Sequence, residues 1–562
     1  MTPRRLLAVD LACLAGLALV SAVLRWWHLG TASLWWDEIL HIGTAQLPSL
    51  VDVFQHARLG LPAGSGNAGA VPLDYLLLHL YLGWVPFPEP ESLERYFRLP
   101  SFLYASLTPP LLYVFVRRHF GRTNAVLAAT LLTLCLPHVL YAAEARFYSL
   151  LTLMTVLDLM AFGWVVTSRA TSAWVVFTLV AVCYFLTGLF GLLVLAAEYA
   201  ALTVTVLARW WHRRRRPDDW HRHEAWIVLA SILVMTAVVA GYFLGLDPHP
   251  RRTPRARGLD PFRVTWQTLP YVFAGSRVLV GAAVAGAACL LVGWRRRGWS
   301  PALCIPLGVV AVGVVPAIVL IERWQHYYFH PRHALFAVPI VHVGAALALT
   351  AAGGWLRGTF GARGRTPLAR VAAGGALLAL VVALQGPLVR QYLEQPNGFL
   401  LRTKMLRDFK GLMRHLGRWL DEVPPPRRLF VLAERFGPGY TANPVLAKYV
   451  RWYGLDDRVV LRGTSSPTST LHRLADECAR HCVGRPGGVL QGRVGSVESL
   501  VMVPPDARRL MRVGPPIGHW PGWVGGVSVL TYEPLRPGPW ARGAKVARFS
   551  GIVSWERRSA DP

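Results

Sequence analysis

The amino-acid sequence predicts a mainly α-helical, polytopic membrane protein with a soluble α/β domain at its C-terminal end. Of the 562 residues, 53% are hydrophobic and only 16% are charged, whereas about a quarter of the residues of a soluble protein are charged. The apolar residues form long blocks, and these blocks stop before Arg390. A purely soluble enzyme, a coiled coil and a porin-type barrel are therefore disfavoured.

The apolar blocks predict about eleven membrane-spanning helices of ~20 residues, the length that a bilayer requires. The first block follows a short basic start, so a cleaved signal peptide is the competing interpretation. We prefer an uncleaved first span because many further spans follow. The predicted spans are residues 6–26, 98–116, 124–142, 148–167, 172–190, 192–209, 226–246, 277–294, 300–320, 334–353 and 371–389.

The arginines set the predicted orientation. The net charge is +28, and basic residues of membrane proteins concentrate in cytoplasmic loops, so nucleic-acid binding is disfavoured. If the N-terminus is cytoplasmic, every inner loop contains arginines: Arg117 and Arg118, Arg213–Arg216, Arg295–Arg297, and Arg357, Arg363, Arg365 and Arg370. Five arginines in the outer loop 247–275 break this rule, and a site that receives anions would explain them. The preference for arginine over lysine is typical of a GC-rich bacterium, so we expect a bacterial inner (plasma) membrane protein.

The same topology divides the chain into two predicted domains. A transmembrane domain covers 1–390 and contains a first outer loop, 27–97, in which the short apolar segment 72–87 is a juxtamembrane helix rather than a span. An extracytoplasmic α/β domain covers 391–562. Its expected strands are 429–433, 500–503, 527–532 and 546–553, and its expected helices lie near 402–421 and 469–482.

Three polar clusters lie at predicted outer membrane faces. Asp37 and Glu38 follow the first span, with His41 one turn further on, and a carboxylate so placed can act as a general base. A solvated pair beside an aromatic belt is the structural alternative. The turn between the third and fourth spans contains Glu144, Arg146 and Tyr148, which form either a structural ion pair or an anion site. The loop 322–333 contains two arginines and three histidines, including His330 and Arg332.

Carboxylates and arginines on one side of a membrane suit a reaction with a hydroxyl nucleophile and a phosphate leaving group. One carboxylate takes the proton of the acceptor, and arginines stabilise the departing phosphate. A lipid-linked phosphosugar is such a substrate. The chain has no Walker A motif, no glycine-rich nucleotide fingerprint and no DxD transferase domain, so a nucleotide-sugar donor is disfavoured.

These motifs, in this order, resemble the GT-C glycosyltransferases, in the broad group (glycosyltransferase family 39-like) that includes protein O-mannosyltransferases and lipid A aminoarabinose transferase. Members have an Asp-Glu pair in the first outer loop, which Asp37-Glu38 match. Arg98-Leu99-Pro100-Ser101 and Glu144-Ala145-Arg146-Phe147-Tyr148 match two further motifs, and Arg332 and Pro339 match a later one in spacing. A His-Pro-Pro-Leu-Tyr-Tyr motif survives only as Val71-Pro72-Leu73-Asp74-Tyr75-Leu76, without its histidine.

The resemblance implies an inverting transferase that uses a polyprenyl-phosphate-linked hexose or pentose, with a cell-envelope glycan, a lipid or a protein as acceptor. Asp37 would be the general base and Glu38 would support it or bind the acceptor. Arg146, Arg332 and Arg98 would hold the donor phosphate. Glu144, Tyr148, His41 and His330 would support them. The resemblance implies no cofactor, and these relatives mostly work without a metal.

Two other functions stay open. A transporter or flippase of a lipid-linked sugar would need ionisable residues near the membrane midplane, and Asp158 and Glu198 are the candidates. A non-catalytic scaffold whose outer domain binds cell-wall polymer is the second. In the outer domain, Cys478 and Cys482 could form a disulfide, or could bind zinc with His472 and His481.

Overall fold

The computed structural model describes residues 3–59, 71–168, 170–212, 219–244, 281–290, 299–325, 331–359 and 367–394, and shorter pieces further along. These pieces are 410, 413–414, 417, 429–434, 444–456, 459–464, 527–531, 533–534, 547–548 and 552–554. The chain forms two compact units. Unit 1 is Met1–Leu29, His41–Phe87 and Arg95–Pro396, and unit 2 is Gly30–Leu40, Pro88–Glu94 and Asn397–Pro562. Unit 2 therefore joins two pieces of the predicted first outer loop to the C-terminal residues, which the sequence did not predict.

Among the described residues, seven helical segments are long and apolar enough to cross a membrane. They lie in α1 (Pro3–Trp26), η1 with α5 (Pro90–Ser92, Leu93–Phe120), α8 (Tyr148–Thr167), η2 with α10 (Leu189–Gly191, Leu192–His212), α11 (Asp219–Phe243), η3 with α15 (Pro331–Ala337, Val338–Thr359) and α16 (Pro367–Glu394). The bent pair α6 (Arg122–Thr133) and α7 (Leu136–Ala142) forms an eighth. Shorter apolar helices are α9 (Thr171–Phe185), Gly281–Leu290, and Pro301–Gly313 within α14 (Pro301–Gln325). Seven of the eleven predicted spans overlap these seven segments, 124–142 overlaps the bent pair, and 172–190, 277–294 and 300–320 overlap the shorter apolar helices. A polytopic, mainly helical membrane protein is thus confirmed, and the number of eleven spans stays a prediction.

The predicted span 124–142 is not one straight helix. It bends by 55° between α6 and α7, and Pro137 lies in the first turn of α7. Proline has no amide hydrogen, and in a continuous helix its ring would collide with the carbonyl of the residue four positions earlier, Thr133. The break therefore follows from the sequence, and it leaves carbonyl groups at the end of α6 that need other donors.

Helices α1 and α5 run antiparallel. Near the start of α1, Asp10 accepts hydrogen bonds from Tyr113 (2.6 Å) and Arg117 (3.2 Å), which lie near the end of α5. At the other end of both helices, Arg98 donates to the Leu29 carbonyl (3.2 Å). We call this second end of unit 1 the Arg98 end.

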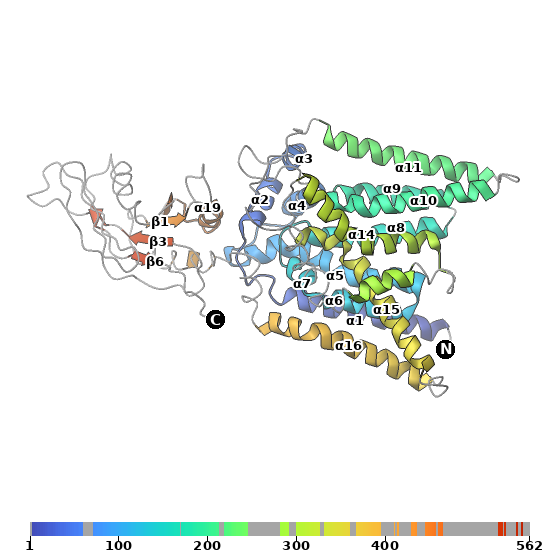
Figure 1. The fold of residues 1–562 in the computed structure, drawn as a ribbon. Coiled ribbons are helices and arrows are strands. Elements are labelled where there is room, and N and C mark those ends of the chain that lie inside the picture. The colour runs from blue at the N-terminus through green and yellow to red at the C-terminus, as the bar shows by residue number, and fades with distance from the viewer. Residues whose placement is uncertain are drawn as a thin grey trace, which may run out of the picture. The chain divides into compact units, whose positions relative to one another are not determined.

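Several short elements also gather at the Arg98 end, where Figure 1 shows α3 (Leu50–Leu59), α4 (Leu73–Trp84) and α7. The amide of Leu73, at the start of α4, donates to the Leu186 carbonyl just after α9 (2.9 Å). Phe190 in η2 then stacks on Phe336 in η3, with ring centroids 6.3 Å apart. The predicted segment 72–87 forms a helix, α4, whose 12 residues are too few to cross a bilayer, and its juxtamembrane location stays a prediction.

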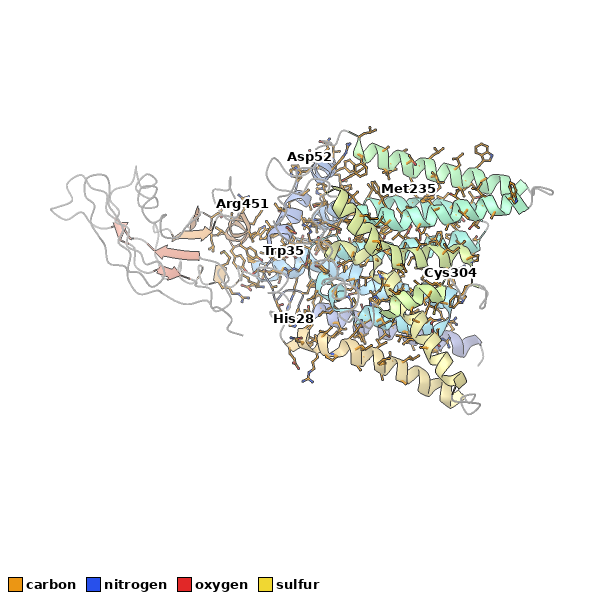
Figure 2. The ribbon with its side chains drawn as sticks, in the orientation of Figure 1. His28, Trp35, Asp52, Met235, Cys304 and Arg451 are labelled. Carbon is orange, nitrogen blue, oxygen red and sulfur yellow. The ribbon has the colours of Figure 1, made fainter. Side chains whose placement is uncertain are left out.

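Unit 1 has one large apolar core and an apolar outer surface. Met235 on α11 and Cys304 on α14 belong to the core (Figure 2). In contrast, Leu19 on α1 and Leu207 on α10 are 66% and 57% exposed. Large exposed apolar side chains along such helices are expected where the surrounding solvent is lipid. The described cysteines of unit 1 are free thiols.

In unit 2 the described strands form an α/β arrangement. A four-stranded sheet has the order β2-β1-β3-β6, made of Val459–Thr464, Leu429–Glu434, Val527–Thr531 and Ile552–Ser554. Strands β1 and β2 are parallel, and the other pairs are antiparallel. Helix α19 (Pro444–Trp452) lies between β1 and β2 in the chain, as a parallel connection requires. Strands β4 (Glu533–Pro534) and β5 (Ala547–Arg548) form a second, small sheet.

The predicted strands 429–433 and 527–532 are confirmed, and 546–553 is divided between β5 and β6. The sequence missed β2 and α19. The expected elements 500–503 and 469–482, with Cys478, Cys482 and their neighbouring histidines, lie outside the described residues, as does most of 402–421.

Candidate functional site

The two predicted catalytic carboxylates occupy different environments at the start of α2 (Trp36–Ala45). Glu38 is fully buried, and its Oε2 accepts a hydrogen bond from the Trp35 amide (3.1 Å). This is half of a capping box, in which the third residue of a helix closes back on the residue before the helix. Asp37, one position earlier, is partly exposed. Asp37 is therefore the accessible carboxylate, while Glu38 helps to shape the turn that presents it.

His41, further along α2, pairs with a carboxylate that the sequence motifs did not single out as a site residue. Its Nε2 lies 2.8 Å from Asp74 Oδ2, and both side chains are buried. The Tyr75 ring lies against the imidazole, with centroids 3.8 Å apart. Asp74 is one of the positions at which the segment 71–76 differs from the motif described above. The His41–Asp74 pair joins α2 to α4 within unit 1.

Arg98 and the Glu144–Tyr148 turn share the Arg98 end. Ser101, one turn after Arg98, donates from Oγ to the Arg146 carbonyl (3.3 Å). The Arg146 guanidinium lies 5.6 Å from the centroids of both the Phe147 and Tyr148 rings. Arg98 is 2% exposed and Arg146 is 7% exposed. The structure thus brings two buried guanidinium groups to one end of the helical unit, as a phosphate site would need.

Glu144 and Tyr148 flank Arg146 in this turn. Both are buried, and the Arg146 amide donates to the Glu144 carbonyl (2.8 Å). Arg146 Nη2 also reaches the Tyr148 hydroxyl at 3.5 Å. The turn is braced further by Ser149, whose hydroxyl donates to the Tyr141 carbonyl (3.0 Å). Arg146 is therefore held by its own turn and by α5.

Arg332 lies in η3, and the packing of η3 on η2 places its backbone at the Arg98 end. Its side chain is outside the described part of the chain, and so is the whole of His330. Within the described residues, no group of three or more His, Cys, Asp or Glu side chains could hold a metal ion.

Sequence reasoning missed a buried arginine, Arg25, in the last turn of α1. Its Nη atoms donate to the carbonyls of Ser21 (3.1 Å), Thr133 (3.4 Å) and Leu132 (3.4 Å), and to His138 Nδ1 (2.6 Å). His138 Nδ1 must accept this bond, so the ring proton is on Nε2, which lies 3.0 Å from Thr152 Oγ1. Arg25 therefore supplies the donors that the α6–α7 break requires. An arginine inside an otherwise apolar block was the signal that could have revealed it.

No family model and no curated protein sequence matches the chain. Among solved structures, the chain is similar to ArnT from Cupriavidus metallidurans in the apo state (13% identity, TM-score 0.46), covering 86% of this chain and 96% of that one. It is also similar to EmbB, an arabinosyltransferase from Mycobacterium smegmatis (17% identity, TM-score 0.39), covering 62% of this chain and 31% of that one. The archaeal oligosaccharyltransferase AglB from Archaeoglobus fulgidus, in complex with an inhibitory peptide and a dolichol-phosphate, is a third (14% identity, TM-score 0.44).

These structural neighbours are glycosyltransferases of the GT-C type. The match to AglB covers 74% of this chain and 58% of AglB, so the chain spans less than two thirds of that protein. At 13–17% identity, the likeness to these structures concerns the fold alone.

Proposed function

We propose that the protein is an integral membrane glycosyltransferase that moves a sugar from a polyprenyl-phosphate donor to a hydroxyl group of an extracytoplasmic acceptor. The observation that supports this function is the pair of buried guanidinium groups, Arg98 and Arg146, at one end of a membrane-spanning unit. A donor anchored by its lipid tail presents its phosphate at that depth. Bidentate arginine contacts suit phosphate oxygens.

In the proposed reaction, Asp37 takes the proton of the acceptor hydroxyl. The acceptor oxygen then forms a bond to the anomeric carbon, and the bond from that carbon to the phosphate oxygen breaks, with inversion. Arg98, Arg146 and Arg332 stabilise the charge that develops on the polyprenyl phosphate as it leaves. Glu38 keeps the turn that carries Asp37 closed. No metal enters these steps.

The orientation that goes with this function has a cytoplasmic N-terminus and an extracytoplasmic Arg98 end. The antiparallel α1–α5 pair supports it, because Arg117 lies at the end opposite Arg98, and the positive-inside rule assigns Arg117 and Arg118 to the cytoplasm. In a bacterial plasma membrane, the acceptor would then be a cell-envelope glycan, a lipid or a protein.

The test is transfer by the purified protein in nanodiscs from undecaprenyl-phosphate-linked hexoses and pentoses to envelope acceptors. Asp37→Asn should lower kcat by at least about a hundredfold, the lower range for loss of a general base. Glu38→Gln keeps an oxygen for the Trp35 amide and should lower it much less. Asp52→Asn, at an exposed carboxylate on α3, is the matched control. Wild-type activity in Asp37→Asn would remove the assignment of the base.

One observation favours the second candidate, a transporter of a lipid-linked sugar. Asp158 on α8 and Glu198 on α10 are both fully buried, and their carboxyl oxygens have no hydrogen-bond partner among the described residues. Ionisable residues buried inside a membrane protein are typical of transport pathways. Movement of the lipid-linked sugar between leaflets of a liposome, lost in Asp158→Asn, together with no sugar transfer, would favour the transporter.

A further inference from the structure

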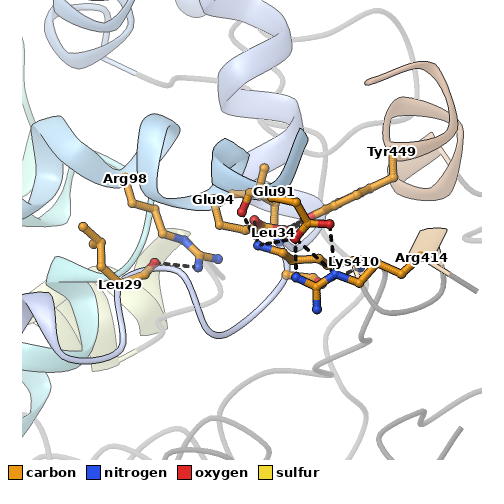
Figure 3. A network of polar contacts seen from close by, with 9 residues as sticks. Leu29, Leu34, Glu91, Glu94, Arg98, Lys410, Arg414 and Tyr449 are labelled. Atoms are coloured by element: carbon orange, nitrogen blue, oxygen red, sulfur yellow. Dashed lines mark hydrogen bonds and ion pairs between the residues drawn. The ribbon is translucent and has the colours of Figure 1, made fainter. Parts of the chain in front are cut away.

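Within unit 2, a buried tyrosine from the C-terminal part of the chain contacts the segment just before α2 and the first turn of α5. Tyr449, on α19, is fully buried. Its hydroxyl accepts a hydrogen bond from the Leu34 amide (2.7 Å) and donates one to Glu94 Oε1 (2.8 Å), as Figure 3 shows. A phenol hydroxyl has one O–H donor and acceptor lone pairs, so the Tyr449 hydroxyl acts here as both a donor and an acceptor.

Lys410 extends the same contact. Its Nζ lies 3.3 Å from Glu94 Oε2, and its backbone amide donates to Ser33 Oγ (3.0 Å). Both oxygens of the fully buried Glu94 carboxylate are therefore bonded to C-terminal residues. The neighbouring Arg414–Glu91 ion pair is about half exposed, and an exposed pair of this kind contributes little. The buried core of the contact is Tyr449, Glu94 and Lys410.

These bonds fix three consecutive residues before α2. The Lys410 amide donates a hydrogen bond to Ser33 Oγ, the Leu34 amide donates one to the Tyr449 hydroxyl, and the Trp35 amide donates one to Glu38 Oε2. Asp37 follows in the first turn of the helix. The direction of the Asp37 side chain depends on the backbone of this turn, so residues that fix the turn also fix the carboxylate.

We propose that Tyr449 is a positioning residue for Asp37, so that the C-terminal part of the chain sets the geometry of the general base. This inference rests on the proposed function. A phenylalanine would fill the same space but would leave the Leu34 amide and one Glu94 oxygen without their buried partner, which is costly. A tyrosine at this position is therefore explained by its hydroxyl rather than by packing alone.

The test compares Tyr449→Phe with Arg451→Gln, a change at an exposed residue of the same helix. In Tyr449→Phe, kcat for transfer from an undecaprenyl-phosphate sugar should fall about tenfold, and amide exchange in a peptide covering 33–40 should speed up by a similar factor, as expected for a lost buried hydrogen bond. The donor KM should stay within about twofold, because Tyr449 is not assigned to the donor. Arg451→Gln should match the wild type in all three measurements.

If Tyr449→Phe does not fold, Glu94→Gln replaces it, because the amide keeps an acceptor for the hydroxyl and loses only the charge facing Lys410. It should shift kcat and exchange in the same direction by a smaller factor. Unchanged exchange, or faster exchange with unchanged kcat, overturns the positioning role. A wild-type protein that transfers no sugar would instead overturn the proposed function, and the exchange data would still show whether Tyr449 orders the turn.

Discussion

The Arg25 contact at the α6–α7 break gives a prediction whose magnitude follows from the geometry. Arg25→Lys keeps the charge but replaces a planar fork by a single ammonium group. One ammonium cannot reach four acceptors spread over α1, the end of α6 and His138, so at least two lose their donor. At about 1 kcal/mol for each lost hydrogen bond, unit 1 should lose about 2 kcal/mol, which corresponds to a fall in Tm on the order of 4 °C.

Thermal unfolding of the purified protein, followed by intrinsic fluorescence, measures this change. Arg118→Lys is the control, because Arg118 is exposed near the opposite end of α5 and its Tm should equal that of the wild type. Arg25→Met removes both the hydrogen bonds and the charge, so its comparison with Arg25→Lys, which keeps the charge, separates the two contributions. If Arg25→Met were more stable than the wild type, the cost of burying the charge would exceed the value of the four bonds. The reasoning from the break would then be wrong.

Two further predictions concern pH and the donor. Burial lowers the pKa of His28, against the opposing effect of its backbone hydrogen bonds to Leu393 and Tyr392, so the neutral ring is the form that the fold favours. The contribution of His28 to stability is therefore complete above about pH 6.5, the ordinary pKa of histidine, and it falls as the pH drops below that value. Between pH 7.5 and pH 5, Tm should fall more steeply in the wild type than in His28→Gln. Equal slopes of Tm against pH would contradict this prediction. Arg332→Ala should weaken binding of an undecaprenyl-phosphate sugar by about tenfold, as expected for loss of a charge-assisted contact. The affinity for the acceptor should change less. If calorimetry gave the same donor affinity for this variant and the wild type, Arg332 would be a residue of the membrane interface only.

The sequence predicted the membrane-spanning helices well because lipid imposes a strong, local requirement. A helix must offer ~20 apolar residues in a row, and that pattern can be read without knowledge of any contact. The sequence signal for the bend at Pro137 is equally local, but hydropathy averaged over a sliding window does not detect it. The span 124–142 was therefore predicted as one helix where the structure has two.

The candidate site was predictable only in part. Arg98 and the Glu144–Tyr148 turn could be found because each lies in a short contiguous motif. The His41–Asp74 and Arg25–His138 contacts join residues 33 and 113 positions apart, and no local pattern encodes such pairing. The capping role of Glu38 was hidden for another reason, because the residue before the helix is Trp35 rather than the serine or threonine that marks a capping box.

The arginines at the two ends of the α1–α5 pair are held by different kinds of partner, and this difference bears on function. At one end, Arg117 and Arg122 pair with the carboxylate of Asp10, so much of their charge is neutralised. At the Arg98 end, Arg25 is held by three carbonyls and a histidine, and within the described residues it pairs with no carboxylate. Neutral partners satisfy the hydrogen-bonding groups of a guanidinium but leave its charge in place, and in a medium of low dielectric constant that charge acts over a longer distance. Arg25 therefore contributes a positive charge to the Arg98 end, and under the proposed function this charge would favour the binding of an anionic headgroup there.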